Sequence, residues 1–501
     1  MEYITQSIAP IDFLIPEDVI SNSSEILVLT HVRFQWKKIN KIALRIFILL
    51  LIFCLITIIT LVILLVYKRY SDIQTSSSIK ANEKYKRYDI LWSFDDNSND
   101  INNSYPGFLV NNPFYINGYI GKALSLNGIN QYVETSAFIN FSNRSFTVEV
   151  WIYWIDRYNY TFNGILGQYS CDESCISKNL HLMIRDKVAY MGFYENDLRG
   201  HTIIENSTWT HLAFVYDYEI LGQQQVYVNG LLDGKRITIP YKGVKGDIVL
   251  GTGYVSAGVD TGRYFTGLID QLSITLRAKT PAEILEDATL CAYYSFDLGS
   301  LADLGPNGLN GSARNIKIIK GRINEALQFS SLISYFQAHG FVALGISNKS
   351  FSIAFWINPL QINKGTIIYV SSSDDSWCLP FIGFNTNGVI FVQIKSDKNT
   401  IITTLGSKLQ TNNWTHIVTT YSKFNGQRIY INGLMYSTSA GNISYSASEQ
   451  SNSITIGTSL ALNSKCNQGE IPSGQFNGSI DELRIYNREL TESEIITLVN
   501  T

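Results

Sequence analysis

An unbroken apolar run at positions 46–67, IFILLLIFCLITIITLVILLVY, is the first feature of the hydrophobic pattern. At a rise of about 1.5 Å per residue, a helix of this length crosses a hydrocarbon core of about 30 Å. The run therefore predicts one transmembrane α-helix. A cleavable signal peptide fits less well, because its apolar region has about 7–15 residues and lies close to the first methionine. A buried core helix is the other alternative.

Positive charge beside this run indicates its orientation, because an excess of Lys and Arg marks the cytoplasmic side. Basic residues are denser before the run than directly after it. They are Arg33, Lys37, Lys38, Lys41 and Arg45 before it, and Lys68 and Arg69 after it. We therefore expect a cytoplasmic tail at 1–45 and a stalk at 68–87 on the other side of the membrane. Further basic residues within the stalk nearly balance the charge over a wider window.

Beyond the stalk the hydrophobic pattern changes to a period of two. In FTVEVWIY at 146–153 the even positions are apolar and the odd positions are mixed, and FSIAFWIN at 351–358 repeats this with apolar odd positions. A period of two predicts strands with one solidly apolar face. Asn229-Gly230 and Asn432-Gly433 lie between strand-like runs. They suit type I′ hairpin turns, which require positive φ at both central residues.

The chain after the stalk contains an internal repeat of two similar sequence units. SNRSFTVEVW at 142–151 recurs as SNKSFSIAFW at 347–356, and the triplet WTH recurs at the same offset of 205 residues. This period is too long for solenoid or propeller repeats of about 20–50 residues, so each copy is expected to have its own core. We expect one domain at 88–287 and a second at 290–501.

A helix-start pattern closes each copy. TPAE at 280–283 and TESE at 491–494 both read Thr-x-x-Glu ahead of Ile and Leu. This is the pattern of a capping box, and the first copy adds proline at the first helical position. A short helix is therefore predicted at the end of each domain.

Composition favours a strand-rich protein and narrows the choice of partners. The 501 residues carry a net charge of −3, and 13% are aromatic, 16% are charged and 36 are glycine. High aromatic and glycine content with few charges is typical of β-sandwiches rather than helical bundles or disordered chains. A nearly neutral chain without a basic stripe is not expected to bind nucleic acid.

The cysteines indicate disulfides rather than zinc. Zinc is disfavoured because no second close cysteine pair and no paired histidines are present. Outside the cytosol, Cys171–Cys175 and Cys378–Cys466 are candidate disulfides, although sequence alone does not fix the connectivity. Cys291 is then left over, and Cys54 lies within the predicted span.

Asn-x-Ser/Thr sequons are frequent after the predicted span. They permit a lumenal or extracellular location without proving it, because many arise by chance in a chain rich in Asn and Ser. The candidate glycosylation sites are Asn102, Asn140, Asn143, Asn159, Asn206, Asn310, Asn348, Asn413, Asn442 and Asn477.

An ordered series of blocks carries a family resemblance. The first copy reads SFTVEVW, WTHLAFVYD, VYVNG and FTGLIDQLSI, and the second reads FSIAFW, WTHIVTTY, IYING and FNGSIDELRIY. Over nearly all of 88–501 this series resembles the laminin-G-like, concanavalin A-like jelly-roll domains. The resemblance implies a mainly β protein with two tandem antiparallel β-sandwiches. The first copy departs at its start, where FDDNSNDINNSYPG stands in place of FDLGSLADLGPNG.

Some relatives on this fold are glucanases, whose activity the family places in an E-x-D-x-E strand. Retaining hydrolysis needs two carboxylates about 5–5.5 Å apart. Here Glu149 is the only acid in its strand, the second copy has Ala354, and E-x-D-x-E does not occur. We therefore interpret Glu149 as a surface or hydrogen-bonded residue, and as a ligand-binding candidate, rather than a catalyst.

His211 and His416 are the next candidates for chemistry. Each follows Trp-Thr, and neither is accompanied by a nucleophile motif, a zinc motif or a phosphate-binding glycine loop. In the resembling family the W-T-H block is structural. We expect packing roles and no catalytic residues.

Four oxygen-bearing residues are candidates for structural calcium. Asp270 and Asp481 follow Gly-x-Ile, and ADLGPNG adds Asp303 and Asn307 in a turn. Calcium prefers such hard oxygen ligands, and in some jelly-roll relatives it lies between a turn of this kind and a late-strand Asp. The alternative is an Asx-turn without metal. No other cofactor is expected.

Trp151 and Trp356 lie on the mixed faces of their strands. On a curved sheet such a tryptophan stacks against a sugar, whereas the simpler alternative is a buried side chain. We keep both residues as ligand-binding candidates.

These patterns predict a single-pass membrane protein at the cell surface, with its carboxyl-terminal portion extracellular. Its predicted role is non-catalytic binding of a glycan or a protein, by analogy with the fold. The alternatives are a glycan-processing enzyme with an unrecognised carboxylate pair, and a structural adhesion stalk.

Overall fold

The chain divides into two compact units, Met1–Tyr85 and Lys86–Thr501. The structure is a computed structural model. It describes residues 87–500 except 136–137, 159–160, 170–175, 221, 254–262, 364, 440, 460–465 and 467–468. In the first unit it describes Leu50, Ile52, Thr57 and Thr60. The rest of the predicted span at 46–67 lies outside the described residues, as do the predicted tail and most of the stalk.

Among the described residues, every helix is too short or too polar to cross a membrane.

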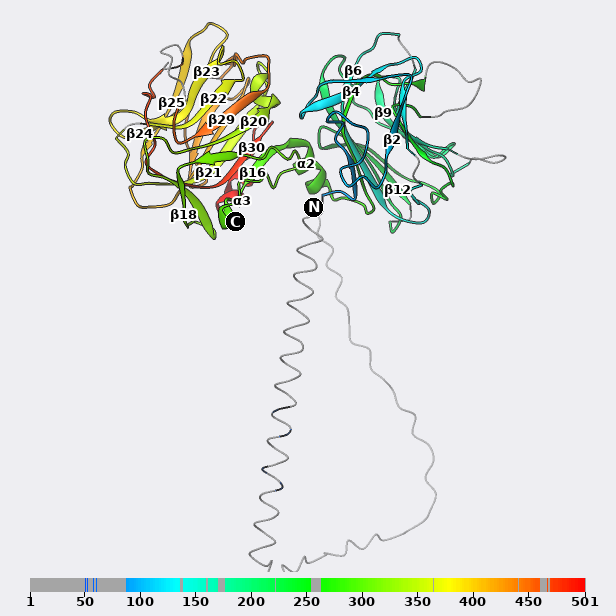
Figure 1. Ribbon diagram of the computed structural model, residues 1–501, viewed down its shortest axis with the longest axis horizontal. Helices are drawn as coiled ribbons and strands as arrows, with labels where there is room; N and C mark the ends of the chain where they lie inside the picture. Colours follow the sequence, from blue (N-terminus) through cyan, green and yellow to red (C-terminus); the bar gives the residue numbers. More distant parts are fainter. Residues whose placement is uncertain are drawn as a thin grey trace, which may run out of the picture. The chain divides into compact units, whose positions relative to one another are not determined.

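The second unit contains two antiparallel β-sandwiches, which Figure 1 shows as pairs of facing strand layers. We call the two layers of each sandwich the helix-side sheet and the far sheet. In the first sandwich the helix-side sheet has the order β13 (Leu231–Ile237), β12 (Gln223–Val228), β11 (Trp209–Asp217), β6 (Phe146–Trp154), β15 (Thr266–Thr275), β4 (Lys122–Asn127) and β3 (Phe114–Asn117), with β1 (Ile90–Trp92) also paired to β15. The far sheet has the order β10 (Asp197–Arg199), β9 (Val188–Gly192), β8 (Leu180–Arg185), β7 (Phe162–Gln168), β14 (Ile248–Leu250), β5 (Tyr132–Thr135) and β2 (Gly107–Val110).

The second sandwich repeats this topology strand for strand. Its helix-side sheet has the order β18 (Ile316–Lys320), β19 (Glu325–Phe329), β30 (Gly478–Tyr486), β21 (Phe351–Pro359), β26 (Thr415–Ser422), β27 (Gly426–Ile431) and β28 (Leu434–Thr438), with β16 (Leu290–Tyr294) paired to β30. Its far sheet has the order β17 (Ser312–Arg314), β20 (Tyr335–Phe341), β29 (Asn452–Ile456), β22 (Gly365–Ser372), β23 (Cys378–Phe384), β24 (Val389–Lys395) and β25 (Ile401–Lys408). Two short 3₁₀ helices, η2 (Asp297–Gly299) and η3 (Val342–Gly345), lie in its loops. The mainly β fold class predicted from the sequence is confirmed.

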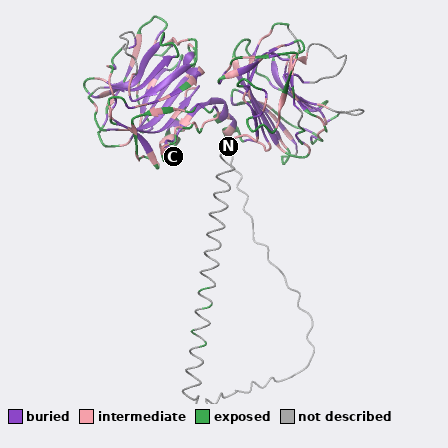
Figure 2. Cartoon of the chain, viewed as in Figure 1, coloured by how far each residue is buried: buried purple, intermediate pink, exposed green. Residues whose placement is uncertain are grey.

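The cores lie between the sheets, as the period of two predicts. Phe146, Val148, Val150 and Ile152 of β6 are fully buried in the core of the first sandwich. Their counterparts in β21 occupy the core of the second. The central strands of both helix-side sheets are also buried on their other face, so buried residues dominate these layers in Figure 2.

The helix at the end of each copy covers that other face. Thr280 caps α2 (Pro281–Thr289) in a complete capping box with Glu283. Ile284 of α2 packs on Ala213, Val215 and Tyr227 of the helix-side sheet. In α3 (Glu492–Asn500), Ile495 packs in the same way on Val418 and Tyr430, among others. The capping prediction is confirmed, and the helices serve to bury the outer face of a sheet.

The two Asn-Gly turns have the predicted conformation. Asn229 and Gly230 have φ of 50° and 83°, and Asn432 and Gly433 have the same pair of values. Positive φ at both central residues is what a type I′ hairpin requires.

Candidate functional site

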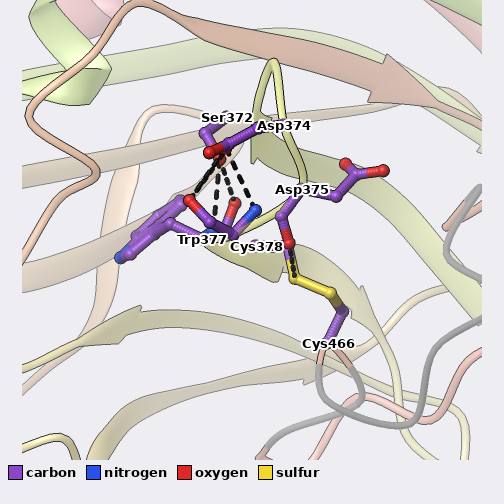
Figure 3. The surroundings of a disulfide bond; sticks show 7 residues. Ser372, Asp374, Asp375, Trp377, Cys378 and Cys466 are labelled. Atoms are coloured by element: carbon purple, nitrogen blue, oxygen red, sulfur yellow. Dashed lines mark hydrogen bonds between the residues drawn. A yellow bond between two sulfur atoms is a disulfide. The ribbon is translucent and has the colours of Figure 1, made fainter.

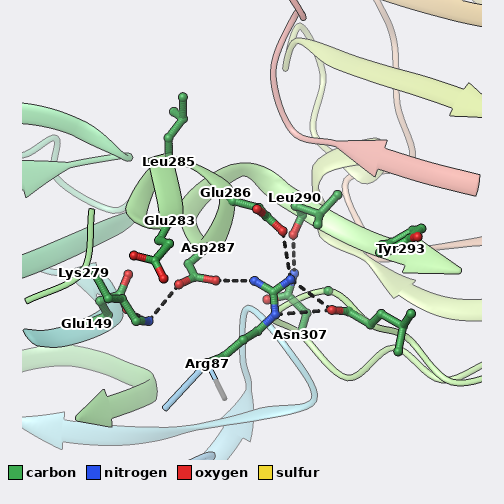
Figure 4. Close-up of polar contacts among 12 residues, drawn as sticks. Arg87, Glu149, Lys279, Glu283, Leu285, Glu286, Asp287, Leu290, Tyr293 and Asn307 are labelled. Carbon is green, nitrogen blue, oxygen red and sulfur yellow. Dashed lines mark hydrogen bonds and ion pairs between the residues drawn. The ribbon is translucent and has the colours of Figure 1, made fainter. Parts of the chain in front are cut away.

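Glu149 belongs to a buried ion network on the helix-side sheet of the first sandwich (Figure 4). Lys279, which precedes α2, donates from Nζ to Glu149 Oε2 and, at 2.8 Å, to Asp287 Oδ2. Burial raises the pKa of Glu149 to about 7, although Lys279 opposes this shift. The geometry pairs Glu149 with Lys279 inside the protein, where both side chains are buried.

Arg87 extends this network to the second sandwich. Its Nη1 donates to Asp287 Oδ1 at 2.6 Å and its Nη2 donates to Glu286 Oε1 at 2.9 Å. Nη2 also donates to the carbonyl oxygen of Leu304 at 3.0 Å. The adjacent cavity has a volume of about 40 Å³, which is room for a few water molecules and not for a sugar ring. This region thus joins parts of the chain, and ligand binding at Glu149 stays a prediction.

The second sandwich has an apolar cluster at the equivalent positions. Ladder register places Ala354 at the position of Glu149, since Ala354 faces Val418 and Arg484 just as Glu149 faces Ala213 and Ser273. Leu490 stands before α3 where Lys279 stands before α2, and it packs with Ala354. The fold therefore tolerates an uncharged cluster at this place.

The two histidines are buried packing residues. Burial lowers the pKa of His211 to about 3 and that of His416 to about 4, so both rings are neutral near pH 7. His211 Nε2 lies 3.7 Å from Glu149 Oε1, which is too long for a hydrogen bond. His211 packs on Trp151 of the neighbouring strand with an angle of 63° between the ring planes, and His416 packs on Trp356 with an angle of 51°.

Asp270 and Asp481 fix a hairpin turn in each copy. Asp270 Oδ2 accepts the backbone N–H of Ile120 at 2.9 Å, and Asp481 Oδ2 accepts those of Arg322 and Ile323 at 2.8 and 3.0 Å. Burial raises the pKa of Asp481 to about 7 and that of Asp270 well above its usual value. Each carboxyl group thus links β15 or β30 to the turn beside it.

Asp303 and Asn307 make the contacts of a structured turn. Asp303 Oδ1 accepts the backbone N–H groups of Tyr293 and Gly305, and Oδ2 accepts that of Leu309, at 2.7–2.9 Å. Asn307 Nδ2 donates to the Leu290 and Cys291 carbonyl oxygens. In the part of the chain that the structure describes, no three His, Cys, Asp or Glu side chains gather as a metal group. These contacts match the Asx-turn alternative, and calcium stays a prediction.

Trp151 and Trp356 are both 6% exposed. Trp151 stacks on Tyr119 with ring centroids 3.6 Å apart. The Tyr119 hydroxyl accepts from Asn487 Nδ2 of the second copy at 3.2 Å. Trp356 carries the guanidinium of Arg322 over its ring at 4.7 Å. Each of the two indole rings therefore already has one protein group stacked on it.

The Cys378–Cys466 disulfide is present, with a Cα–Cα distance of 5.2 Å, and that prediction is confirmed. Figure 3 shows it beside a turn in which Ser372 Oγ donates to Asp374 Oδ1 at 2.6 Å and accepts from the Trp377 N–H at 3.1 Å. Cys171 and Cys175 lie outside the described residues, and Cys54 does too. Cys291 is a buried free thiol.

Most sequon asparagines in the described part of the chain are exposed. Asn477 is half-buried, and Asn159 lies outside the described residues. The exposed ones are Asn102, Asn140, Asn143, Asn206, Asn310, Asn348, Asn413 and Asn442.

A cleft of about 510 Å³ opens on the outward face of the far sheet in the first sandwich. Because Leu182 and Ile184 of β8 point into the core, the alternating His181, Met183 and Arg185 point outward into the cleft. Further lining residues come from neighbouring strands and loops. They include Phe162, Tyr169, Tyr190, Tyr194, Glu195, Asp197 and Arg263.

Polar contacts hold the cleft in shape. Arg185 Nη1 donates to the Tyr190 hydroxyl at 2.8 Å. Asp197 Oδ1 accepts the backbone N–H of Phe193 at 3.0 Å, and His181 Nδ1 lies 3.0 Å from the Gly253 carbonyl oxygen. Burial and the Asp197 carboxylate raise the pKa of Tyr190, and burial lowers that of His181. The cleft therefore offers aromatic faces and oriented polar groups around a buried floor.

The equivalent face of the second sandwich is covered. Tyr369 of β22 packs under the Cys378–Cys466 disulfide and is 2% exposed. Gly383 takes the place of Met183, and a Cβ there would lie 2.4 Å from the Ile471 side chain. Gln393 Oε1 accepts the N–H of Glu470 at 3.2 Å. The disulfide-linked segment thus occupies the surface that is hollow in the first copy.

Sequence reasoning missed this cleft. The alternation of His181, Met183 and Arg185 with core leucines and isoleucine was a usable signal for an outward-facing polar row. It was not distinctive, because the lining also includes residues far along the chain, such as Gly253 and Arg263. Only the strand pairing brings these segments together.

The fold and the cleft define a tandem jelly-roll protein with a concave site of ligand-binding size. The profile of the Laminin_G_3 family, described as the Concanavalin A-like lectin/glucanases superfamily, matches residues 127–285 and 334–496, which together exceed half of the chain. The chain belongs to this superfamily.

Solved structures of similar proteins include domain 4 of AbnA, a GH43 extracellular arabinanase from Geobacillus stearothermophilus, in complex with arabinotriose. The identity is 24%, over 42% of this chain and 98% of that one, with a TM-score of 0.30. The binding domains of Paraclostridial Mosquitocidal Protein 1 and of botulinum neurotoxin serotype G are 22% and 18% identical, each with a TM-score of 0.32. They align with 43% and 42% of this chain, and the chain spans 52% and 50% of their lengths. A comparison with curated proteins gave no match.

Proposed function

We propose that the first sandwich binds a glycan in its far-sheet cleft, without catalysis. The observation that carries this proposal is the 510 Å³ hollow lined by Phe162, Tyr190, Tyr194 and Arg185, which suits stacking and hydrogen bonding to a sugar. Copy comparison supports it, because Met183, Tyr190 and Asp197 correspond to Gly383, Phe391 and Thr403 on the covered face of the second sandwich. We therefore expect one glycan site per chain.

A glycan array probed with the full chain in mild detergent tests the proposal. Tyr194→Ala removes an aromatic ring that is 45% exposed at the cleft, and we expect the array signal to fall at least tenfold. The matched control is Tyr436→Ala, which removes a ring that is 52% exposed on β28 of the second sandwich. Equal loss in both variants, or no bound glycan, contradicts the proposal. Release of sugar products from a bound glycan contradicts its non-catalytic part.

We also propose that residues 46–67 anchor the chain as a single-pass protein, with the sandwiches on the extracellular side. The disulfide supports an oxidising environment, and exposed sequons are compatible with glycosylation. Protease protection combined with a glycosidase mobility shift on intact cells tests this topology. A carboxyl-terminal portion digested only after permeabilisation contradicts it.

A further inference from the structure

Arg185 is placed in the cleft as a preorganised cation. Its guanidinium carbon lies 5.0 Å from the ring centroid of Phe162 and 4.9 Å from that of Tyr190. The hydrogen bond from Nη1 to the Tyr190 hydroxyl fixes the rotation of the group. Stacking and one hydrogen bond restrict a flexible side chain before any ligand arrives, which lowers the entropy lost on binding.

No carboxylate among the described residues forms an ion pair with Arg185, whereas two cations on neighbouring segments of this sandwich are paired. Arg199 pairs with Asp186 at 3.3 Å, and Lys187 pairs with Asp156 at 2.8 Å. Two acids line the same cleft, Glu195 and Asp197. Asp197 Oδ1 accepts the backbone N–H of Phe193, and its carboxylate acts on the Tyr190 hydroxyl rather than pairing with Arg185. The guanidinium carbon of Arg263 also lies 5.9 Å from the centroid of the Phe162 ring.

The fold itself does not require an arginine here. Counting along the paired strands from Met183 and its counterpart Gly383, Arg185 corresponds to Asn385, which lies in a turn. A half-buried arginine at the open cleft is thus a feature of the first copy alone. Guanidinium groups bind carboxylate and sulfate through paired hydrogen bonds, and these charge-assisted bonds are the strong ones.

We infer that the cleft selects acidic glycans, with Arg185 holding a carboxylate or sulfate group of the sugar. This inference rests on the proposed glycan site and specifies its ligand class. Phe162 and Tyr190 keep the guanidinium in place.

Calorimetric titration of the full chain in mild detergent tests the inference with acidic probes and their neutral counterparts, of which lactose 3′-sulfate and lactose differ by a single anionic group. The pairs are 3′-sialyllactose against lactose, lactose 3′-sulfate against lactose, and trigalacturonate against galactotriose. We expect at least one acidic member to bind about tenfold or more tightly than its neutral partner, and this preference to weaken as salt is raised. The Arg185→Met variant is expected to lose the preference, and Arg185→Lys is expected to keep part of it.

The matched control is Arg199→Met, because Arg199 lies outward on β10 with a side chain that is 55% exposed. It is expected to keep the full preference. Equal affinity for both members of every pair, or an unchanged preference in Arg185→Met with an unchanged melting temperature, overturns the inference. If array glycans that bind are all neutral, the acidic class is wrong and the glycan site stands. If no array glycan binds, both fall together.

Discussion

Glu149 and Ala354 occupy the same register position in the two sandwiches, and one is a buried carboxylate where the other is a methyl group. Around Glu149 the first copy places Lys279 and Asp287, and around Ala354 the second places apolar partners such as Leu490. Buried ion pairs seldom stabilise a fold more than apolar groups of similar volume. The charged version therefore contributes specificity, since Arg87 uses it to join the start of the first sandwich to Leu304 of the second.

Removing the buried Lys279 ammonium group should lower the free energy of unfolding, because Glu149 and Asp287 stay buried without it. Lys279→Met leaves the carboxylates of Glu149 and Asp287 without their shared donor, and we expect a loss of about 3–5 kcal/mol in the free energy of unfolding. Urea denaturation measures it. Lys122→Met, which breaks the exposed pair with Asp96, should change stability by less than about 1 kcal/mol.

A second variant replaces the ion network of the first sandwich with apolar residues like those at the equivalent positions of the second sandwich. Glu149→Ala, Lys279→Leu and Asp287→Leu together should be neutral or stabilising, because the three buried charges are removed together and Arg87 keeps Glu286 and the Leu304 carbonyl oxygen as partners. A triple variant that is less stable than Lys279→Met alone would contradict this account.

The buried carboxyl group of Asp481 should make stability depend on pH. Burial raises its folded pKa to about 7, above the value of 3.8 that is usual for Asp. Between these values the folded state holds a proton that the unfolded state has released, so this contribution is full below about pH 4 and is lost as pH rises through 7. Relative to Asp481→Asn, the parent chain should lose stability between pH 5 and pH 8 by urea denaturation.

Asp374 provides a control, because its pKa is shifted in the opposite direction from that of Asp481. Hydrogen bonds from Ser372 and Ser376 hold its pKa at about 2, so its contribution is lost only as pH falls below about 4. Asp374→Asn should therefore leave the change between pH 5 and pH 8 as it is in the parent. A parent and Asp481→Asn variant with parallel profiles would contradict the protonation of Asp481.

The disulfide should stabilise the second sandwich and keep its far sheet covered. The bond closes a sequence separation of 88 residues, and Cys466→Ser should cost about 2–5 kcal/mol in the free energy of unfolding. Hydrogen exchange should become faster in β22 and β23 around Tyr369, because the covering segment loses its attachment. Cys291→Ala is the control, since it removes a buried thiol outside any disulfide and should leave exchange there unchanged.

Trp151 should matter for stability and not for glycan binding. Trp151→Ala removes a 6% exposed ring that stacks on Tyr119, and we expect a loss of about 3–5 kcal/mol by urea denaturation. Array binding at 4 °C should persist in this variant and fall in Tyr194→Ala. Loss of array binding in Trp151→Ala with binding kept in Tyr194→Ala would instead indicate that a sugar stacks on Trp151.

The sequence by itself determined the elements whose causes are local. The period of two at Phe146–Trp154 and Phe351–Pro359, the Thr280 and Glu283 capping box, and the paired Asn-Gly turns all depend on neighbours within a few positions. The internal repeat then established that there are two sandwiches of one kind.

Only the tertiary structure decided which surface is hollow and which charges meet. Glu149 and Lys279 are 130 positions apart, and the cleft draws on β7 to β10 and on Gly253 and Arg263. Such contacts follow from strand pairing and sheet packing, which a local pattern does not encode. The two copies show this directly, because nearly the same sequence pattern gives an open cleft in one and, with Ile471 and a disulfide over the sheet, a covered face in the other.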